Sequence, residues 1–227
     1  MLKVININHY YLLYYMNQKS EKFESIYLRP NNAPWTYSQI PSEFSDLIKN
    51  GIISPPGKVL EIGCGEGHQA IFLAKSGFDV VAIDRSRNAI NFAKQNASKQ
   101  KINVDFRNQE YHQIDSYKEK FDFIFDWRFL HEITGEIERK KYVATISNLL
   151  KLKGKYLSVS FSGDSDFMGT GKLRKSPAGI EIYFSTLVDL QNLVNKYFEI
   201  LDSKVIFVPQ KPDLSIEANY ILAQKKN

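Results

Sequence analysis

Cysteine is almost absent from this chain, since Cys64 is the only one among 227 residues. A disulfide needs two cysteines, and cysteine-based zinc sites need several ligands of that kind. The sequence therefore excludes a disulfide-stapled fold and a cysteine-built metal centre, and we expect no bound metal. With 12 glycines, 8 prolines and 43% hydrophobic residues, it also excludes collagen-like, low-complexity and disordered chains.

Long apolar runs are scarce as well. The only one free of acidic residues extends from Leu2 to Met16, and it contains Lys3 and His9. This run is too short and too polar to span a bilayer. It also lacks the basic start and the small-residue cleavage site of a signal peptide. We therefore expect a cytoplasmic protein without a membrane partner.

The chain has only a small excess of positive charge. The chain has 30 Lys and Arg against 25 Asp and Glu, which gives a net charge of +5. Such a balance permits nucleic-acid binding without arguing for it, and no aromatic RNA-binding motif is present. The charge balance therefore does not favour a nucleic-acid partner. The oligomeric state stays open, and we favour a monomer.

Apolar strands alternating with amphipathic helices are what the chain does contain. An aromatic-rich extension without a clear period covers residues 1–37, and the regular pattern covers 38–227. We interpret the extension as a segment that either covers the active site or packs outside it. Predicted helices are Ser38–Asn50, Gly67–Ser76, Ser86–Lys101, Glu136–Leu152 and Thr186–Tyr197. Predicted strands are Lys58–Ile62, Asp79–Ile83, Asn103–Phe106, Phe121–Phe125, Lys155–Phe161, Ile200–Val208 and Ile216–Gln224. This order predicts an α/β fold with a doubly wound, mostly parallel seven-stranded sheet and an antiparallel C-terminal edge hairpin.

The most informative segment is the glycine-rich turn between the first predicted strand and the helix that follows. Gly63, Gly65 and Gly67 alternate there, and Glu61 precedes them. Ligands of open α/β sheets bind outside the carboxyl ends of the strands, and glycines at such a turn permit close backbone approach. We therefore expect this turn to form the floor of a ligand site.

The spacing of the turn selects among ligands. A dinucleotide fingerprint needs glycine at the sixth position, which is His68 here, and no lysine stands in P-loop register. Asp84 ends the second predicted strand, where an acidic side chain can bind both hydroxyls of a ribose. The pattern favours a nucleoside ligand that needs no phosphate contacts.

These two motifs resemble those of the class I S-adenosylmethionine-dependent methyltransferases. The fourth strand, Phe121–Asp126 with Phe129–Ile133 after it, and the fifth strand around Gly154–Leu157 continue the resemblance. Pro34-Trp35 and the glycine-bearing loop after the fifth strand are most like the thiopurine, thiol and tellurite-resistance-type small-molecule branch. The resemblance implies a Rossmann-like methyltransferase fold, S-adenosylmethionine as the cofactor, and methyl transfer to a small molecule.

The resemblance also implies roles for individual residues. Those expected at the cofactor are Trp35, Glu61, Gly63, Cys64, Gly65, Gly67, Asp84, Arg85, Gln109, Glu110, Asp126 and Trp127. Asp84 would bind the ribose, and Glu61 would lie near the methionine end. Gln109 or Glu110 would face the adenine, although the usual Gly-Asp pair is replaced by Asn108-Gln109. Trp35 has an equally plain interpretation as a packing residue.

Residues expected at the substrate are Arg128, His131, Lys172 and Arg174. His131 is the one candidate general base, with a packed histidine as the alternative. The long segment 162–182 is interpreted as a lid that is flexible at its glycines, with Lys172 and Arg174 attracting an anionic substrate. Cys64 has no activating base nearby in the sequence, so we interpret it as a packed residue rather than a nucleophile.

The mechanism follows from the chemistry of a sulfonium. In-line displacement of the methyl group needs chiefly orientation in a dry site. Since the sequence shows no well-placed base pair, it favours a thiol or a related soft nucleophile as the acceptor. Two alternatives stay open: a methyltransferase acting on RNA or protein, and a non-catalytic protein that binds the cofactor.

Overall fold

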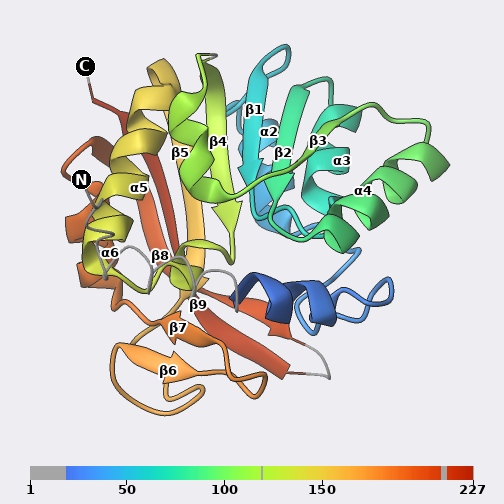
Figure 1. Ribbon diagram of the computed structural model, residues 1–227. Helices are drawn as coiled ribbons and strands as arrows, with labels where there is room; N and C mark the ends of the chain where they lie inside the picture. Colours follow the sequence, from blue (N-terminus) through green and yellow to red (C-terminus); the bar gives the residue numbers. More distant parts are fainter. Residues whose placement is uncertain (1–18, 119, 211–213, 227) are drawn as a thin grey trace, which may run out of the picture.

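The ligand edge of a parallel sheet organises this structure, a computed structural model that describes residues 19–118, 120–210 and 214–226 (Figure 1). The parallel strands run downward in Figure 1, so their carboxyl ends lie at the bottom of the sheet. The residue 19–37 segment and the segment after β5 lie below that edge. The apolar run Leu2–Met16 lies outside the described residues.

Seven strands form the main sheet in the order β3-β2-β1-β4-β5-β9-β8. Their bounds are β1 Lys58–Ile62, β2 Asp79–Asp84, β3 Asp105–Asn108, β4 Phe121–Trp127, β5 Leu150–Phe161, β8 Phe198–Gln210 and β9 Leu214–Lys225. Strands β1 to β5 are parallel, whereas β9 is antiparallel to both β5 and β8. The predicted doubly wound sheet with an antiparallel edge hairpin is therefore confirmed.

Helices cover both faces of this sheet. The helices are α2 Ser42–Lys49, α3 His68–Lys75, α4 Arg87–Lys99, α5 Glu136–Leu149 and α6 Leu187–Val194. Helices α2, α3 and α4 pack on one face, while α5 and α6 pack on the other. Each strand therefore places alternate side chains into two separate cores, which explains why the central strands read as unbroken apolar runs.

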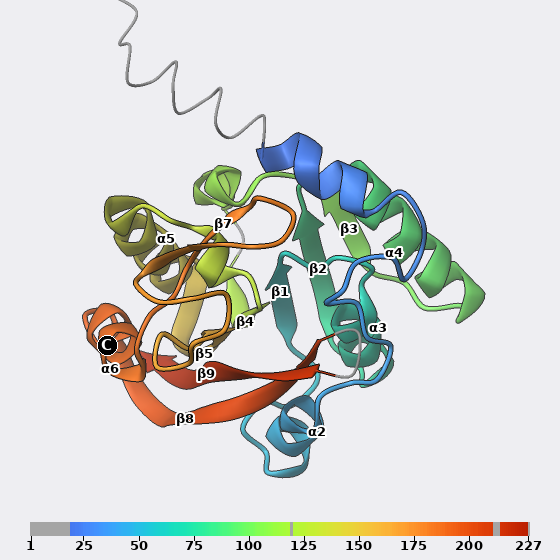
Figure 2. The same ribbon diagram turned by 90° about the horizontal axis from the view of Figure 1, so that it is seen from below.

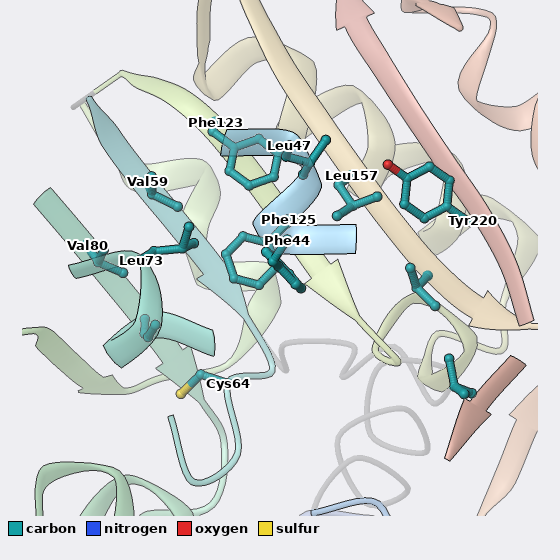
Figure 3. Packing of buried hydrophobic residues seen from close by; sticks show 14 of the residues in the cluster. Phe44, Leu47, Val59, Cys64, Leu73, Val80, Phe123, Phe125, Leu157 and Tyr220 are labelled. Atoms are coloured by element: carbon teal, nitrogen blue, oxygen red, sulfur yellow. The ribbon is translucent and has the colours of Figure 1, made fainter. Parts of the chain in front are cut away.

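Aromatic rings pack in the first core, which lies between the sheet and helices α2, α3 and α4. The ring of Phe44 on α2 meets the ring of Phe125 edge-on, with 4.9 Å between centroids (Figure 3). The centroid of the Phe44 ring lies 5.2 Å from that of Trp127. Phe123 stacks beside Phe125 at 5.5 Å. Edge-to-face and offset contacts of this kind add to the free energy of apolar burial. Helix α2 thereby packs against the carboxyl-terminal part of β4.

Side-chain caps set the starts of two helices. Ser86 Oγ accepts a hydrogen bond from the Ala89 amide at 3.1 Å, and Thr186 Oγ1 accepts one from the Asp189 amide at 3.0 Å.

Several helix ends differ from their predicted positions. Helix α2 begins at Ser42 rather than Ser38, and α6 ends at Val194 rather than Tyr197. Helix α5 stops at Leu149, and the residues from Leu150 onward belong to β5, because Leu150 takes an extended conformation with ψ 142°.

Two further pieces of structure carry no periodic signal in the sequence. Residues 19–26 are helical, and a small antiparallel sheet pairs β6, Leu173–Lys175, with β7, Glu181–Tyr183. Short 3-10 turns, η1 Tyr111–Ser116 and η2 Leu130–Glu132, follow β3 and β4. Such short pieces owe their conformation to tertiary contacts rather than to their own propensity. None of the helices described here is long and apolar enough to cross a membrane.

Asp126 is a buried carboxylate in the second core, which lies between the sheet and helices α5 and α6. Its oxygens accept hydrogen bonds from the hydroxyls of Tyr142, Tyr156 and Ser158 at 2.9, 2.5 and 2.8 Å. Leu130 adds its amide at 3.3 Å. Burial raises the pKa of Asp126 from 3.8 to about 6, while these donors act in the opposite direction.

We expect the Asp126 carboxyl to make stability depend on pH. Because its pKa is higher in the folded state, its contribution is fully present below pH 4 and is lost as the pH rises through 6. A shift of this size corresponds to about 3 kcal/mol. The free energy of unfolding of the wild type, minus that of Asp126→Asn, should therefore fall by roughly this amount between pH 4 and pH 7. Urea titrations at several pH values measure it, and a difference independent of pH would contradict the prediction.

Candidate functional site

A cavity of about 530 Å³ opens at the carboxyl ends of β1, β2 and β4. Its floor is the glycine turn after β1, and its roof comes from residues 23–41 on one side and residues 167–182 on the other (Figure 2). The end of the β8–β9 hairpin closes a third side with Pro209, Gln210 and Leu214. This volume lies within the usual range for small-molecule sites.

The glycine turn is held against β2. The amides of Gly63 and Cys64 both donate to the carbonyl of Ile83, at 2.9 and 3.0 Å. Gly63 has φ +74°, and a Cβ there would lie 2.7 Å from the ring of Phe129. Gly65 has φ +52°, and its Cβ would lie 2.9 Å from the hydroxyl of Tyr27. Both positions need glycine for backbone conformation and for space.

Asp84 connects this turn with the end of β2. One of its oxygens accepts from the Gly65 amide at 2.9 Å, and the other accepts from the Ser86 amide at 2.8 Å. Burial raises the pKa of Asp84, while these two backbone donors act against the rise. Each carboxylate oxygen can accept a second hydrogen bond, so a diol such as a ribose edge can bind to the same group.

Glu61 supplies a negative group beneath the turn. The side chain is buried and lines the cavity, and its Oε2 has no hydrogen-bond partner among the described residues. Burial raises the pKa of Glu61 well above its ordinary value. A buried carboxylate oxygen without a donor costs free energy unless a ligand supplies one. The ammonium group of a methionine-type ligand is such a donor, so the residues present fit S-adenosylmethionine.

The residues expected at the adenine take different positions. Arg85 and Gln109 line the cavity, whereas Glu110 does not and instead pairs with Arg85 at 2.9 Å. The side-chain Oε1 of Gln109 accepts a hydrogen bond from the Tyr117 hydroxyl at 2.6 Å. The backbone amide of Gln109 donates to the Asp84 carbonyl. Tyr111 adds an aromatic wall that the sequence analysis missed. Glu110 thus acts on this end of the site only through Arg85.

The N-terminal segment contributes an aromatic roof. The indole nitrogen of Trp35 donates to the hydroxyl of Tyr27 at 2.8 Å, and the Trp35 ring contacts that of Phe23 at 5.9 Å. All three side chains line the cavity. Glu24 fixes the segment by accepting from Ser86 Oγ at 2.5 Å and from the Asn88 amide. Of these residues, only Trp35 was predicted, because the segment has no helical period.

The end of β4 divides its side chains between the cavity and the core. Trp127 lines the cavity, but Asp126 points to the opposite face and is completely buried. Successive residues of a strand face opposite sides, so only one of the two can reach the ligand. The structure therefore places Asp126 in the second core and not beside the cavity.

Arg128 follows with φ +67° and brings a guanidinium to the cavity wall. It donates to the carbonyl of Pro209 at 2.9 Å and to the side chain of Gln210, and it lies 5.2 Å over the ring of Phe161. Burial lowers the pKa of Arg128 to about 10. Its Nε has no hydrogen-bond partner, so the group keeps one donor for a ligand.

His131 lies on the same wall and is buried. Its ring stacks on Phe161 with 4.1 Å between centroids, and its Nδ1 accepts from the Phe161 amide at 3.4 Å. Burial lowers the pKa of His131 well below its ordinary value, and the neighbouring cations Arg128, Lys19 and Arg139 add to the effect. The imidazole is therefore neutral at pH 7, with its hydrogen on Nε2.

Lys172 and Arg174 do not line the cavity. Lys172 is exposed and pairs with Asp189 at 3.3 Å. Arg174 is buried, and its guanidinium donates to four backbone carbonyls of the loop, those of Gly163, Ser165, Phe167 and Gly171. Arg174 therefore fixes the shape of the loop that we expected to be flexible, and neither cation is placed to bind a ligand in the cavity.

Two more residues were expected at the cofactor, Gly67 and Cys64, and only Cys64 borders the cavity. Gly67 lies outside the cavity, where a Cβ would lie 2.7 Å from the Phe106 ring, so it serves helix–strand packing. Cys64 borders the cavity but is buried in the first core, and burial raises the pKa of its thiol. A thiol with a raised pKa is a poor nucleophile. No cluster of metal-binding side chains occurs in the described part of the chain.

The sequence analysis missed several residues at the end of the cavity that lies beside the turn after β4. Glu132 lines the cavity and pairs with Lys19, and Phe161, Phe167, Met168, Ile180 and Ile182 form an apolar wall. Glu132 stands next to His131 in the sequence, and its place on the turn after β4 was the one available signal. Phe161 ends the predicted fifth strand, whereas the other residues of the apolar wall come from the segment after it, whose conformation no periodic pattern predicts.

Together, the glycine turn, Asp84 at the end of β2 and the buried Glu61 form one end of a cavity in an α/β protein, and the other end is apolar. A family described as "Methyltransferase domain" matches residues 53–215. The chain belongs to this family, the class I S-adenosylmethionine-dependent methyltransferases, and S-adenosylmethionine is its cofactor. The resemblance found in the sequence is thus confirmed, including the likeness to the TehB-type branch.

Individual relatives support the same assignment. A 2-heptyl-1-hydroxyquinolin-4(1H)-one methyltransferase of Mycobacteroides abscessus is 30% identical over 144 residues, which cover 63% of this chain and 61% of that protein. The 1,6-didemethyltoxoflavin-N1-methyltransferase of Burkholderia thailandensis, solved with its acceptor and S-adenosylhomocysteine, has a TM-score of 0.70 at 20% identity, covering 100% and 93% of the two chains. TehB of Haemophilus influenzae has a TM-score of 0.64 at 20% identity, covering 82% and 63%.

These similarities cover only part of each curated relative, and the solved structures are distant in sequence. The chain spans 61–62% of the lengths of several curated relatives that it matches. The two solved structures are about one fifth identical to it, and they share its fold. The family and the cofactor follow from the comparisons, and the acceptor has to be argued from the cavity itself.

We expect Asp84→Ala to weaken the binding of S-adenosylhomocysteine about 100-fold, because two hydrogen bonds to a charged acceptor are lost. Isothermal titration measures this affinity. Asp79→Ala is the matched control, since Asp79 begins the same strand, is exposed and pairs only loosely with Lys58 at 3.8 Å. Equal affinity of the wild type and Asp84→Ala would contradict the role of Asp84.

Proposed function

We propose that this protein transfers the methyl group of S-adenosylmethionine to a small, largely apolar molecule. One observation carries the proposal. The cavity extends from Glu61 and Asp84 to an apolar compartment bordered by Phe161, Met168 and Ile182, and a roof from two segments covers it. Small-molecule sites combine such an apolar lining with a few polar groups.

The cofactor half of the cavity is formed by the ends of β1, β2 and β3. In our proposal Asp84 binds the ribose hydroxyls and Glu61 the ammonium group. Arg85 and Gln109 border the adenine, and Trp35 closes over the ligand from the N-terminal segment. Residues 19–37 thus serve as a cover of the site, as the sequence suggested for the extension 1–37.

The chemistry of the acceptor half is mainly positioning. The cofactor, when bound, supplies a methyl group attached to a positively charged sulfur. The apolar wall around Phe161 and Ile182 excludes water, and the roof holds the acceptor at the end of β4. Alignment of the reacting atoms in a dry compartment accounts for a large part of the rate of such a displacement.

The chemical nature of the acceptor atom is less restricted than the sequence suggested. A thiol was favoured because no base pair was evident in the sequence. The cavity, however, contains the carboxylate of Glu132 beside His131. An acceptor with a hydroxyl or a ring N–H therefore fits as well as a thiol, and we propose an acceptor that carries one such hydrogen.

Larger acceptors and a purely binding role fit less well. The roof segments are joined by Lys22, whose Nζ donates to the carbonyl of Gly179 at 2.9 Å, so a nucleic acid or a folded protein would have to displace them. A non-catalytic role leaves the apolar compartment beyond the cofactor half without a purpose. Both alternatives predict binding of the cofactor without transfer to small molecules.

The test is methyl transfer to a defined panel. We expect the protein, incubated with S-adenosylmethionine, to methylate at least one of 2-heptyl-1-hydroxyquinolin-4(1H)-one, 1,6-didemethyltoxoflavin, phenylmethanethiol and 4-nitrothiophenol. Mass spectrometry of product and S-adenosylhomocysteine measures it. Both tryptophans, Trp35 and Trp127, line the cavity, so intrinsic fluorescence reports binding independently. Transfer to bulk RNA or protein, with none to the panel, would overturn the proposal.

A further inference from the structure

Lys19 is a buried cation that the N-terminal helical segment inserts at the acceptor end of the cavity. Its ammonium lies 2.9 Å from Glu132 Oε2 and donates to the Glu132 carbonyl at 2.6 Å. A third contact, at 3.2 Å, reaches the carbonyl of Glu181 on β7. Two of these contacts are hydrogen bonds to backbone carbonyls, and the third is an ion pair with the carboxylate. Lys19 therefore holds one particular glutamate against both the turn after β4 and the loop that roofs the cavity.

The other oxygen of Glu132, Oε1, accepts no hydrogen bond from the part of the chain that the structure describes. Oε1 lies 3.5 Å from Nε2 of His131, which is longer than the range of about 2.7–3.2 Å typical of an N–H···O hydrogen bond. Glu132 lines the cavity, as do His131 and Arg128. This oxygen can therefore accept a hydrogen bond from a ligand.

His131, in contrast, has no free nitrogen that could accept a proton from a ligand. In the neutral imidazole only one nitrogen has a lone pair, and here that nitrogen, Nδ1, faces the Phe161 amide. Its Nε2 carries the hydrogen and faces Glu132. Stacking on Phe161 fixes the ring in this orientation. Of the two neighbours on this turn, Glu132 is the one that can receive a proton.

We propose that Glu132 receives the proton of the acceptor's nucleophilic X–H group, where X is oxygen, sulfur or nitrogen, and that Lys19 is its positioning residue. This inference rests on the proposed function. As the X–H bond breaks, the proton passes to Glu132 Oε1, and the electron pair left on X forms the bond to the methyl carbon. The electron pair of the broken carbon–sulfur bond stays on sulfur, and the proton is later lost to solvent.

The charges around the acceptor end suit this step. The guanidinium of Arg128 lies on the same wall, and its hydrogen-bond partners among the described residues, the Pro209 carbonyl and the Gln210 side chain, are uncharged. Its positive charge stabilises negative charge that develops on X. The acceptor class that fits is therefore an uncharged, ring-bearing molecule with one X–H group, which enters protonated and ionises only as methyl transfer proceeds.

The test compares an acceptor that needs a base with one that does not. Phenylmethanethiol is protonated at neutral pH, whereas 4-nitrothiophenol is ionised. We expect Glu132→Gln to lower kcat about 100-fold with phenylmethanethiol, the usual scale of general base catalysis. With 4-nitrothiophenol the change should stay within about threefold, because that acceptor has no proton to lose.

Lys19 and Lys22 give a matched pair on one helical segment. Both donate to a carbonyl of the roofing loop, but only Lys19 pairs with a carboxylate in the cavity. Lys19→Met should lower kcat for phenylmethanethiol about tenfold with little change for 4-nitrothiophenol, and Lys19→Arg should restore most of it. Lys22→Met removes a roof contact without touching Glu132, so it should change the rates with both thiols by the same factor.

Each result then has one meaning. Equal losses with both thiols would show that Glu132 is only structural, and no loss with either would show that it plays no part, so both overturn the inference. A wild type that binds S-adenosylhomocysteine but methylates none of the X–H compounds in the panel overturns the acceptor class. Failure to bind S-adenosylhomocysteine overturns the proposed function itself. Titration of S-adenosylhomocysteine into every variant, with affinities within about twofold of each other, confirms that only the acceptor end has changed.

Discussion

The hydrogen bonds of Asp84 are the constraint on which the rest of the site depends. One carboxylate holds the Gly65 amide of the turn after β1 and the Ser86 amide at the start of α4. It thereby fixes the distance between the two strand ends that flank the cofactor half of the cavity. The turn itself can follow this path because Gly63 and Gly65 adopt positive φ angles and lack side chains. A parallel sheet supplies the convergence of these ends, and the carboxylate gives them a fixed geometry.

A second set of charges connects the roof with this floor. Glu24 binds the start of α4, Lys19 binds Glu132 after β4, and Lys22 reaches the loop at Gly179. The N-terminal segment therefore touches both halves of the cavity and the opposite roof. Buried ion pairs contribute little net stability, but loss of one partner leaves an uncompensated charge, so they select one arrangement among several. The cover of the site and the proposed proton acceptor thus depend on the same contacts.

Prediction from the sequence succeeded where a residue acts through its own strand or turn. The strand Lys58–Ile62 was predicted with its observed bounds, and the turn that follows it lies at the cavity as expected. Prediction was less successful at Asp126, where a shift of one residue along β4 exchanges the cavity for the core. Arg174 was expected to bind substrate because it stands in a glycine-rich loop, yet its guanidinium binds that loop's own carbonyls. A sequence does not say whether a cation faces a ligand or its own backbone.

The sequence by itself determined the family, the order of strands and helices, and the cofactor, because these follow from hydrophobic periodicity and from two short motifs at strand ends. Tertiary structure alone decided what lies at the acceptor end. Lys19 and Glu132 are 113 residues apart, and Arg128 meets Pro209 across 81 residues. No local pattern records such pairs, since they form only when the sheet brings its strand ends together and the two roof segments pack over them. The physical reason is that local propensity acts over a few residues, whereas the chemistry of this cavity depends on charges contributed by distant parts of the chain.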